Sequence, residues 1–171
     1  MLMFQNVRQT SLVILGAVGA TIGGALVFEH GLGLTPCKLC LLQRNPYYLA
    51  MPLALAAFLA PQRTARLFLA AVGVVFTVSA AMGAYHAGVE WGFWLGPSDC
   101  GAANTAPTSG GMGDFLARLE NTRVVSCTEA AWRFLGLSLA GWNVLISLAL
   151  SALAFWTAAA SRSRARDVAS P

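Results

Sequence analysis

Charged side chains are scarce in this chain of 171 residues. Lys and Arg number 11, Asp and Glu number 7, and together they make up 11% of the sequence, whereas average soluble proteins carry about 25%. Hydrophobic residues make up 57%, which excludes intrinsic disorder, because disorder requires low hydrophobicity. A soluble domain is excluded as well, since so few charges cannot cover its surface. We expect one domain, residues 1–171, whose apolar surface faces lipid.

Charges are missing altogether from four long stretches of the sequence. A membrane-spanning helix needs roughly 17–25 mainly apolar residues, and the apolar runs here are continuous, which favours helices over strands in lipid. The predicted fold class is therefore all-α: an integral membrane bundle of four transmembrane helices, with two larger loops on one side at about residues 29–44 and 86–138. The predicted spans lie at about residues 11–28, 45–60, 67–85 and 139–159.

The few charges predict the orientation of the bundle. The two ends of the chain and the loop between the second and third spans carry six basic residues and one acidic residue, Asp167. The two larger loops carry five basic and six acidic residues. Because basic loops stay in the cytoplasm, we expect both termini inside and both larger loops outside. The basic tail is explained by topology and by contact with anionic lipid, so no nucleic-acid partner is predicted.

The first span allows a second interpretation and carries a packing motif. A cleaved signal peptide is disfavoured, because the apolar run exceeds the roughly 7–15 residues of a signal peptide. Gly19 and Gly23 form a GxxxG pair, a spacing that lets helices approach closely. The frequency of glycine and alanine in the chain accounts for the pair equally well, and either interpretation gives these glycines a role in helix packing.

All four cysteines fall in the two outer loops: Cys37, Cys40, Cys100 and Cys127. Free cysteine is a common buried hydrophobe, so chance would place some of them in the spans. Their position on the oxidising side indicates that the thiols are used as disulfides. Three pairings are possible in principle. We expect a resting state with Cys37–Cys40 and Cys100–Cys127.

Cys37 and Cys40 form a CxxC pair at the start of the second span. A disulfide that closes two intervening residues restrains the unfolded chain very little, so the pair is a poor structural crosslink. Its value is chemical, because a helix N-terminus and a nearby cation lower the pKa of a thiol. Arg44, four residues after Cys40, supplies such a cation.

Motifs for bound metals and electron carriers are missing. A zinc site is disfavoured, because the second cysteine pair is not CxxC and the chain has only two histidines, His30 and His86. Leu41 follows Cys40, so the CxxCH haem motif is absent, and no flavin or iron–sulfur pattern is present. A lipid-soluble quinone is the simplest electron acceptor, with Arg44 beside its carbonyl oxygen to stabilise developing negative charge.

The second cysteine pair lies in a long outer loop. Residues 101–113 are rich in glycine, alanine and threonine, and residues 114–120 place apolar side chains at helical spacing. The latter segment predicts a short amphipathic helix at the membrane surface, with an ordinary loop helix as the alternative. A Cys100–Cys127 disulfide there has even odds of being a structural crosslink. Thiol–disulfide exchange is favoured because both pairs lie on the same side.

The chain resembles the bacterial disulfide bond formation protein B (DsbB) family, membrane quinone reductases that reoxidise the periplasmic oxidase DsbA. The resemblance covers nearly the whole chain and four spans in matching order. The matching segments are Pro36-Cys-Lys-Leu-Cys40 with Gln43-Arg44, His86, Gly96-Pro-Ser-Asp-Cys100, and Cys127-Thr-Glu-Ala-Ala-Trp-Arg-Phe-Leu-Gly136 with Trp142 beyond.

The resemblance implies a role for each cysteine. Cys100 matches the residue that forms a mixed disulfide with the soluble partner, a periplasmic DsbA-like oxidase of thioredoxin fold. Cys127 matches its mate, which passes electrons inward to Cys37. Cys40 matches the cysteine adjacent to the quinone ring. The resemblance also implies that the protein lies in the bacterial inner membrane, with both redox loops in the periplasm.

Two further positions match residues near the quinone. Arg44 matches the arginine that binds and polarises it, and His86 lies where the family has a quinone-proximal histidine, although a packing role is as well supported. Gln43 departs from members with an acid there, so no proton relay is assigned to it. Ubiquinone and menaquinone fit equally. The alternatives are a vitamin K epoxide reductase-like quinone reductase and a non-enzymatic membrane subunit with structural disulfides.

Overall fold

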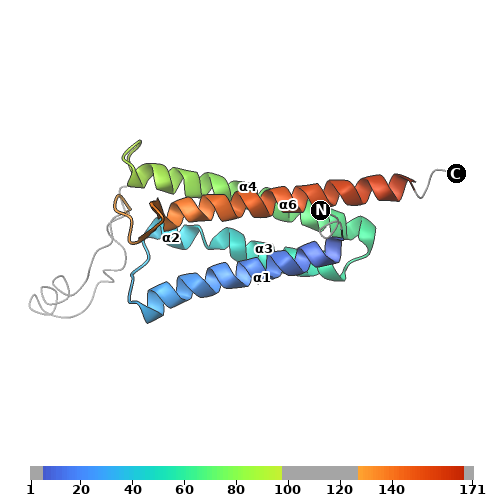
Figure 1. Cartoon of the computed structure of the whole chain (residues 1–171), viewed down its shortest axis with the longest axis horizontal. Coiled ribbons are helices and arrows are strands. Elements are labelled where there is room, and N and C mark those ends of the chain that lie inside the picture. Colours follow the sequence, from blue (N-terminus) through green and yellow to red (C-terminus); the bar gives the residue numbers. More distant parts are fainter. Residues whose placement is uncertain (1–5, 98–126, 168–171) are drawn as a thin grey trace, which may run out of the picture.

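The structure, a computed structural model, describes residues 6–97 and 127–167. Its long helices lie side by side along one axis, and the short helix α2 caps one end of the bundle (Figure 1). The start of α1 and the end of α6 lie at the opposite end (Figure 1). The helices are α1 Val7–Leu26, continued by the π-helix η1 Val27–Gly31, then α2 Lys38–Leu42, α3 Asn45–Leu59, α4 Gln62–Glu90 and α6 Leu139–Asp167.

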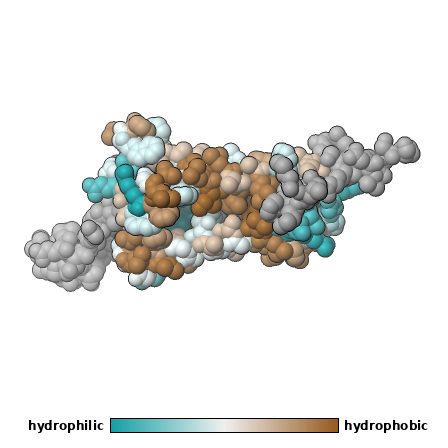
Figure 2. Space-filling model, in the orientation of Figure 1, coloured by the Kyte–Doolittle hydropathy of each residue, from teal (hydrophilic) through white to brown (hydrophobic). Residues whose placement is uncertain are grey.

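Three of these helices are long and apolar enough to cross a membrane. They are Val7–Gly31, Gln62–Glu90 and Leu139–Ser161, and each contains one of the predicted spans. Figure 2 shows apolar residues along the middle of the bundle and hydrophilic residues toward both ends. The chain is therefore a multi-pass membrane protein built mainly of helices.

The second predicted span, residues 45–60, forms the helix α3, which has 15 residues. At 1.5 Å per residue this helix is about 22 Å long, shorter than the roughly 30 Å hydrocarbon core of a bilayer. The helix begins at Asn45 and is continuous through Pro52. The number of membrane crossings, four, stays a prediction.

A small β-hairpin corrects the all-α prediction. The strands β1 Arg133–Phe134 and β2 Leu137–Ser138 pair antiparallel just before α6. Leu135 and Gly136 between them have φ angles of 53° and 82°, and a two-residue hairpin turn of this kind needs positive φ at both positions. Strands of two residues are too short for an alternating pattern, so hydropathy gives no sign of them.

The tightest helix contact joins α4 to α6. A Cβ atom added at Gly83 would lie 2.9 Å from the Val144 side chain and 3.3 Å from its backbone nitrogen, so glycine permits this approach. Hydroxyl groups add hydrogen bonds across the same interface, such as Ser147 to Ser79 at 3.0 Å. The expected packing role of Gly19 and Gly23 is wrong within the described chain, because a Cβ at either position would meet no atom within 4 Å.

Aromatic side chains gather at the end of the bundle that carries α2. One cluster stacks Trp132 on Phe134, with ring centroids 5.7 Å apart, and continues to Phe28 and Trp142. The other cluster follows α4 and stacks Tyr85 on Trp94 at 6.0 Å, next to two further aromatic rings of the same segment. Such belts are typical of the boundary between membrane and water.

Candidate functional site

The CxxC pair occupies the first turn of α2. Cys37 is the residue that precedes the helix, and the backbone N–H of Cys40 donates to its sulfur at 3.3 Å. This is the usual contact between a capping side chain and the third helical residue, so the two-residue spacing of the motif brings both sulfurs together. The Sγ atoms lie 2.9 Å apart and both are free thiols. The expected Cys37–Cys40 disulfide is therefore not formed in this structure.

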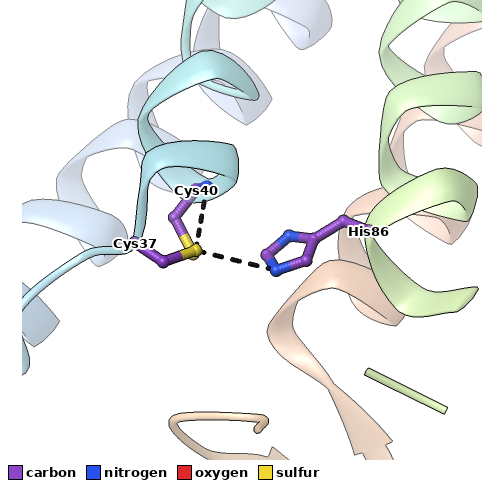
Figure 3. Close-up of side chains that lie close together, drawn as sticks. All are labelled: Cys37, Cys40 and His86. Carbon is purple, nitrogen blue, oxygen red and sulfur yellow. Dashed lines mark hydrogen bonds between the residues drawn. The ribbon is translucent and has the colours of Figure 1, made fainter. Parts of the chain in front are cut away.

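His86 faces this pair from α4. Its Nε2 atom lies 3.7 Å from the sulfur of Cys37, and Figure 3 shows the ring pointing from α4 across to the sulfur. The amide nitrogen of Gln43 donates to His86 Nδ1 at 2.8 Å. A neutral imidazole that accepts at Nδ1 carries its proton on Nε2, so the Nε2–H group points at Cys37. His86 therefore contacts the sulfur of Cys37 directly.

A chain of hydrogen bonds holds Gln43 in this orientation. The Asn143 amide donates to Gln43 Oε1 at 2.8 Å, and the Tyr47 hydroxyl donates to Asn143 Oδ1 at 2.5 Å. Tyr47 and Asn143 both also contact Ser147, deep in the bundle. Because each amide has both a donor and an acceptor contact, the network leaves one consistent orientation for Gln43. Three helices, α3, α4 and α6, therefore position the His86 ring.

The two thiols of the pair differ in acidity. The pKa of Cys37 is lowered to about 4, because Cys40 donates a hydrogen bond to its sulfur and His86 adds a second. The pKa of Cys40 is raised, because its proton is held in the bond to Cys37 and the group is buried. Hydrogen bonds thus lower the pKa of Cys37; the expectation that Arg44 supplies the cation for this effect is not supported by its contacts.

Arg44 forms an ion pair with an acidic residue that the charge count used only to predict the orientation of the bundle. Its Nη1 atom donates to Glu29 Oε2 at 2.6 Å, and the two side chains are 14% and 26% exposed. Glu29 comes from η1, at the end of the first span. A guanidinium has five N–H donors, so this ion pair fixes the side chain and leaves donors for another acceptor.

A cavity of about 420 Å³ connects these groups. Its walls are mostly apolar side chains from α1, η1 and α6, including Phe28, Trp142 and Ile146. Its polar lining includes Cys40, Arg44 and the other groups described above. Ligand sites are of this kind, mainly apolar with a few convergent polar groups.

Glu90 is a second acid that sequence reasoning missed. It lies one turn after His86 on α4, and its Oε1 atom is 3.8 Å from His86 Nε2. The side chain is 4% exposed, and Oε2 has no hydrogen-bond partner among the described residues. An i, i+4 histidine–glutamate pair is a signal that the sequence contains, but its burial beside the cysteines depends on the packing of α4.

Cys127 lies next to the CxxC pair although 90 positions separate it from Cys37. Both residues are 2% exposed, and they share one buried apolar cluster with Leu39 and Val89, against which Cys40 packs. Cys127 is itself disulfide-bonded. Cys100 and the predicted amphipathic helix at residues 114–120 lie outside the described residues. The structure therefore places the CxxC pair, called the inner pair below, beside Cys127, one member of the second or outer cysteine pair.

Comparison with known proteins gives consistent matches. The family model described as "Disulfide bond formation protein DsbB" matches residues 7–157. A disulfide bond formation protein B from Pseudomonas syringae pv. tomato is 37% identical over 147 residues, which cover 83% of each chain. One from Marinobacter nauticus is 33% identical over 153 residues, or 80% of this chain and 84% of the relative. No solved structure gives a significant match.

Proposed function

The chain belongs to the disulfide bond formation protein B family, and on that premise we propose that it is a quinone-dependent thiol–disulfide oxidoreductase of the bacterial inner membrane. It reoxidises a periplasmic DsbA-like dithiol oxidase and passes the electrons through two cysteine pairs to a membrane quinone. The observation that carries this proposal is the shared buried cluster of Cys37 and Cys127, beside a cavity that Cys40 and Arg44 line.

The outer pair receives electrons from the partner. Cys127 is disulfide-bonded, and we propose Cys100 as its partner, as the family resemblance implies. A thiolate of the reduced partner protein attacks Cys100 and displaces Cys127 as a thiolate. The second partner thiol then releases Cys100. The partner becomes a disulfide, and two electrons with two protons remain on Cys100 and Cys127.

The inner pair then takes these electrons. The Cys127 thiolate attacks Cys37 of the Cys37–Cys40 disulfide, Cys40 leaves as a thiolate, and Cys100 attacks Cys127 to restore the outer disulfide. Cys37 and Cys40 are left reduced. From this reduced state the electrons leave the protein.

We propose that this cavity is the quinone site. Its apolar walls suit a ring with a prenyl tail, and Arg44 and His86 line it beside Cys40, so these residues would hold the head group. When bound, a quinone would supply the acceptor for two electrons and two protons. The Glu29 contact holds Arg44 in place, so its remaining N–H groups can stabilise negative charge on a carbonyl oxygen without reorganisation.

This function requires the cysteine site to lie on the periplasmic face of the membrane. We assign α3 as the fourth crossing, because a short helix is accommodated by local thinning of the bilayer or by its neighbours. Four crossings place both ends of the chain on the cytoplasmic side. The basic residues at the two ends and between α3 and α4 favour the same orientation.

The test uses purified protein in detergent, a reduced DsbA-like protein and a soluble quinone analogue. We expect quinone reduction that depends on the dithiol protein, loss of turnover in Cys40→Ser, and a trapped mixed disulfide through Cys100 in mass spectra. Normal turnover by Cys40→Ser would exclude the mechanism. Two inert disulfides that never exchange with the partner would instead support a structural membrane subunit.

A further inference from the structure

The reduced inner pair and His86 form a cluster of metal-ligating atoms. The two sulfurs and a ring nitrogen all lie within 4.8 Å of one another, and this is the one such group in the described residues. A zinc ion with Zn–S bonds of about 2.3 Å holds sulfur and nitrogen ligands about 3.6 Å apart in tetrahedral geometry. The Cys37 sulfur and His86 Nε2 are 3.7 Å apart. The side chains are thus close to a ligating arrangement.

The two sulfurs need only a small adjustment. They lie 2.9 Å apart, whereas two thiolates on one zinc ion are about 3.8 Å apart. Rotation of the Cys40 side chain about its Cα–Cβ bond supplies that separation. A residue pair of the form CxxC at a helix N-terminus is a common half of a structural zinc site, and here the other half comes from α4.

Glu90 lies beside this group but outside the set of ligand atoms that are all within 4.8 Å of one another, so its side chain has to move to serve as a fourth ligand. Its carboxylate lies 3.8 Å from His86 Nε2, is 4% exposed, and has one oxygen without a hydrogen-bond partner in the described chain. A buried carboxylate oxygen without a partner is costly, and a bound cation removes that cost. This unpartnered atom is an observation independent of the thiol cluster, and it lines the same cavity.

We propose that Cys37, Cys40, His86 and Glu90 form a tetrahedral site for a borderline-soft divalent cation of the zinc class, and that this site exists only when the inner pair is reduced. On binding, both sulfurs coordinate as thiolates and any thiol proton goes to solvent. Oxidation to the Cys37–Cys40 disulfide removes two ligands and releases the ion. Ligation through Nε2 places the imidazole proton on Nδ1, so the hydrogen bond that Gln43 donates to Nδ1 is lost and the network behind the ring rearranges.

Regulation of turnover by zinc is a second claim, and it rests on the proposed function. An ion on Cys37 and Cys40 keeps both thiolates from giving up electrons, so zinc inhibits turnover and does so only after reduction of the inner pair. Binding itself does not depend on the redox function. The two claims are therefore measured separately.

The binding test uses the full chain in detergent, reduced and then freed of reductant without oxygen, with cobalt(II) as the spectroscopic probe. We expect one cobalt ion per chain, intense visible bands typical of tetrahedral cobalt, and displacement by zinc. The same spectrum in Cys100→Ser/Cys127→Ser places the ion on the inner pair. Protein whose inner pair is oxidised should bind no cobalt.

Two variants test the ligands, and a third is their control. His86→Ala should weaken cobalt binding by at least about 100-fold, since the loss of an outer-shell partner alone costs about 10–100-fold. Glu90→Gln should weaken it about tenfold and alter the visible bands. Glu129→Gln is the matched control, because Glu129 lines the same cavity outside the cluster, and it should bind like the wild type.

Unchanged affinity and spectrum in both His86→Ala and Glu90→Gln would overturn the site and leave simple thiolate binding. Equal binding by the oxidised protein would overturn the redox dependence. For the regulatory claim, zinc should abolish quinone reduction at the concentration that displaces cobalt. A protein that binds cobalt as expected but has no turnover without zinc would refute the proposed function and not the metal site.

Discussion

The imidazole Nε2 of His86 lies 3.7 Å from the sulfur of Cys37, across a gap between α4 and α2. The contact gives the thiolate of Cys37 a hydrogen-bond donor that is fixed by Gln43 on the far side of the ring. A donor held in this way stabilises the reduced pair, because a stabilised thiolate makes a disulfide a stronger oxidant. The geometry of one histidine thus bears on the redox potential of the inner pair.

Replacing His86 by alanine should lower the reduction potential of the Cys37–Cys40 pair. His86 lowers the pKa of Cys37, so its loss raises that pKa and weakens the dithiol form relative to the disulfide. Each unit of pKa lost corresponds to about 30 mV for a two-electron couple. Equilibration with glutathione buffers containing a chelator, followed by alkylation and mass spectrometry, measures the shift.

His86→Gln is the informative comparison, because an amide donor near the sulfur recovers part of the hydrogen bond. A potential between those of the wild type and His86→Ala is expected. Equal potentials for all three proteins would show that the Nε2 contact does not act on the pair.

The potential of the inner pair should depend weakly on pH. The pKa of Cys37 is lowered to about 4 and that of Cys40 is raised, so between about pH 5 and pH 8 the reduced pair carries one proton. Reduction then takes up two electrons and one proton, which gives a slope of about 30 mV per pH unit in place of about 60 mV for an ordinary dithiol. Potentials measured across this range test the slope.

The sign of the pH dependence of stability follows from the lowered pKa of Cys37. Stabilisation of the folded, reduced protein by Cys37 is present above the pKa of an unfolded cysteine and is lost as the pH falls through about 4. A slope of about 60 mV per pH unit throughout the neutral range would mean that Cys37 is an ordinary thiol in the folded protein.

Arg44→Gln should raise the KM for the quinone analogue by about 10–100-fold, the loss expected for a charge-assisted hydrogen bond. The variant also leaves Glu29 without its cation, so Arg44→Gln/Glu29→Gln separates loss of binding from the unpaired charge. Steady-state kinetics at varied quinone concentration give KM and kcat.

The matched control is Arg133→Gln, which removes an exposed arginine of the β-hairpin. It should leave the KM for the quinone analogue near that of the wild type. An unchanged KM in Arg44→Gln would remove Arg44 from the cofactor site and leave it as a structural partner of Glu29.

Gly83→Ala should destabilise the bundle by about 1–3 kcal/mol, the usual cost of overpacking. The added Cβ would lie 2.9 Å from Val144 and 3.2 Å from the amide nitrogen of Asn143, so both the helix contact and the network behind His86 would be displaced. Gly19→Ala is the control, because its Cβ meets no described atom within 4 Å. Thermal unfolding in detergent compares the two, and equal losses would refute the packing argument.

Much of the helical architecture could be predicted, because lipid penalises charge and the charges mark the ends of the apolar stretches. The span expected at residues 139–159 lies within the apolar helix Leu139–Ser161, and the span at 67–85 lies within α4. The hairpin around Leu135 was missed, since two-residue strands leave no periodic pattern. Gly19 was assigned a packing role from spacing alone, and spacing does not say which face of a helix meets a neighbour.

The candidate site was predicted residue by residue but not as an arrangement. The arrangement of the CxxC pair depends on local geometry alone, because its spacing is that of a capping residue and the third residue of a helix. The partners of Arg44 and His86 could not be read in the same way. Glu29 and Glu90 are two of the six acidic residues that were counted only to predict orientation, and the packing of η1 and α4 brings them to Arg44 and His86.

The hydrogen-bond network that runs from Ser147 through Asn143 to Gln43 has a consequence for protein engineering. A nine-residue loop that carries Pro36-Cys-Lys-Leu-Cys40 and Arg44, transplanted to another membrane helix, would lack the ring and the amide groups that α4 and α6 contribute. Its thiols would titrate near their ordinary values and its disulfide would be a weak oxidant. The oxidising power of this motif is a property of the whole bundle, and a portable version would have to include three helices.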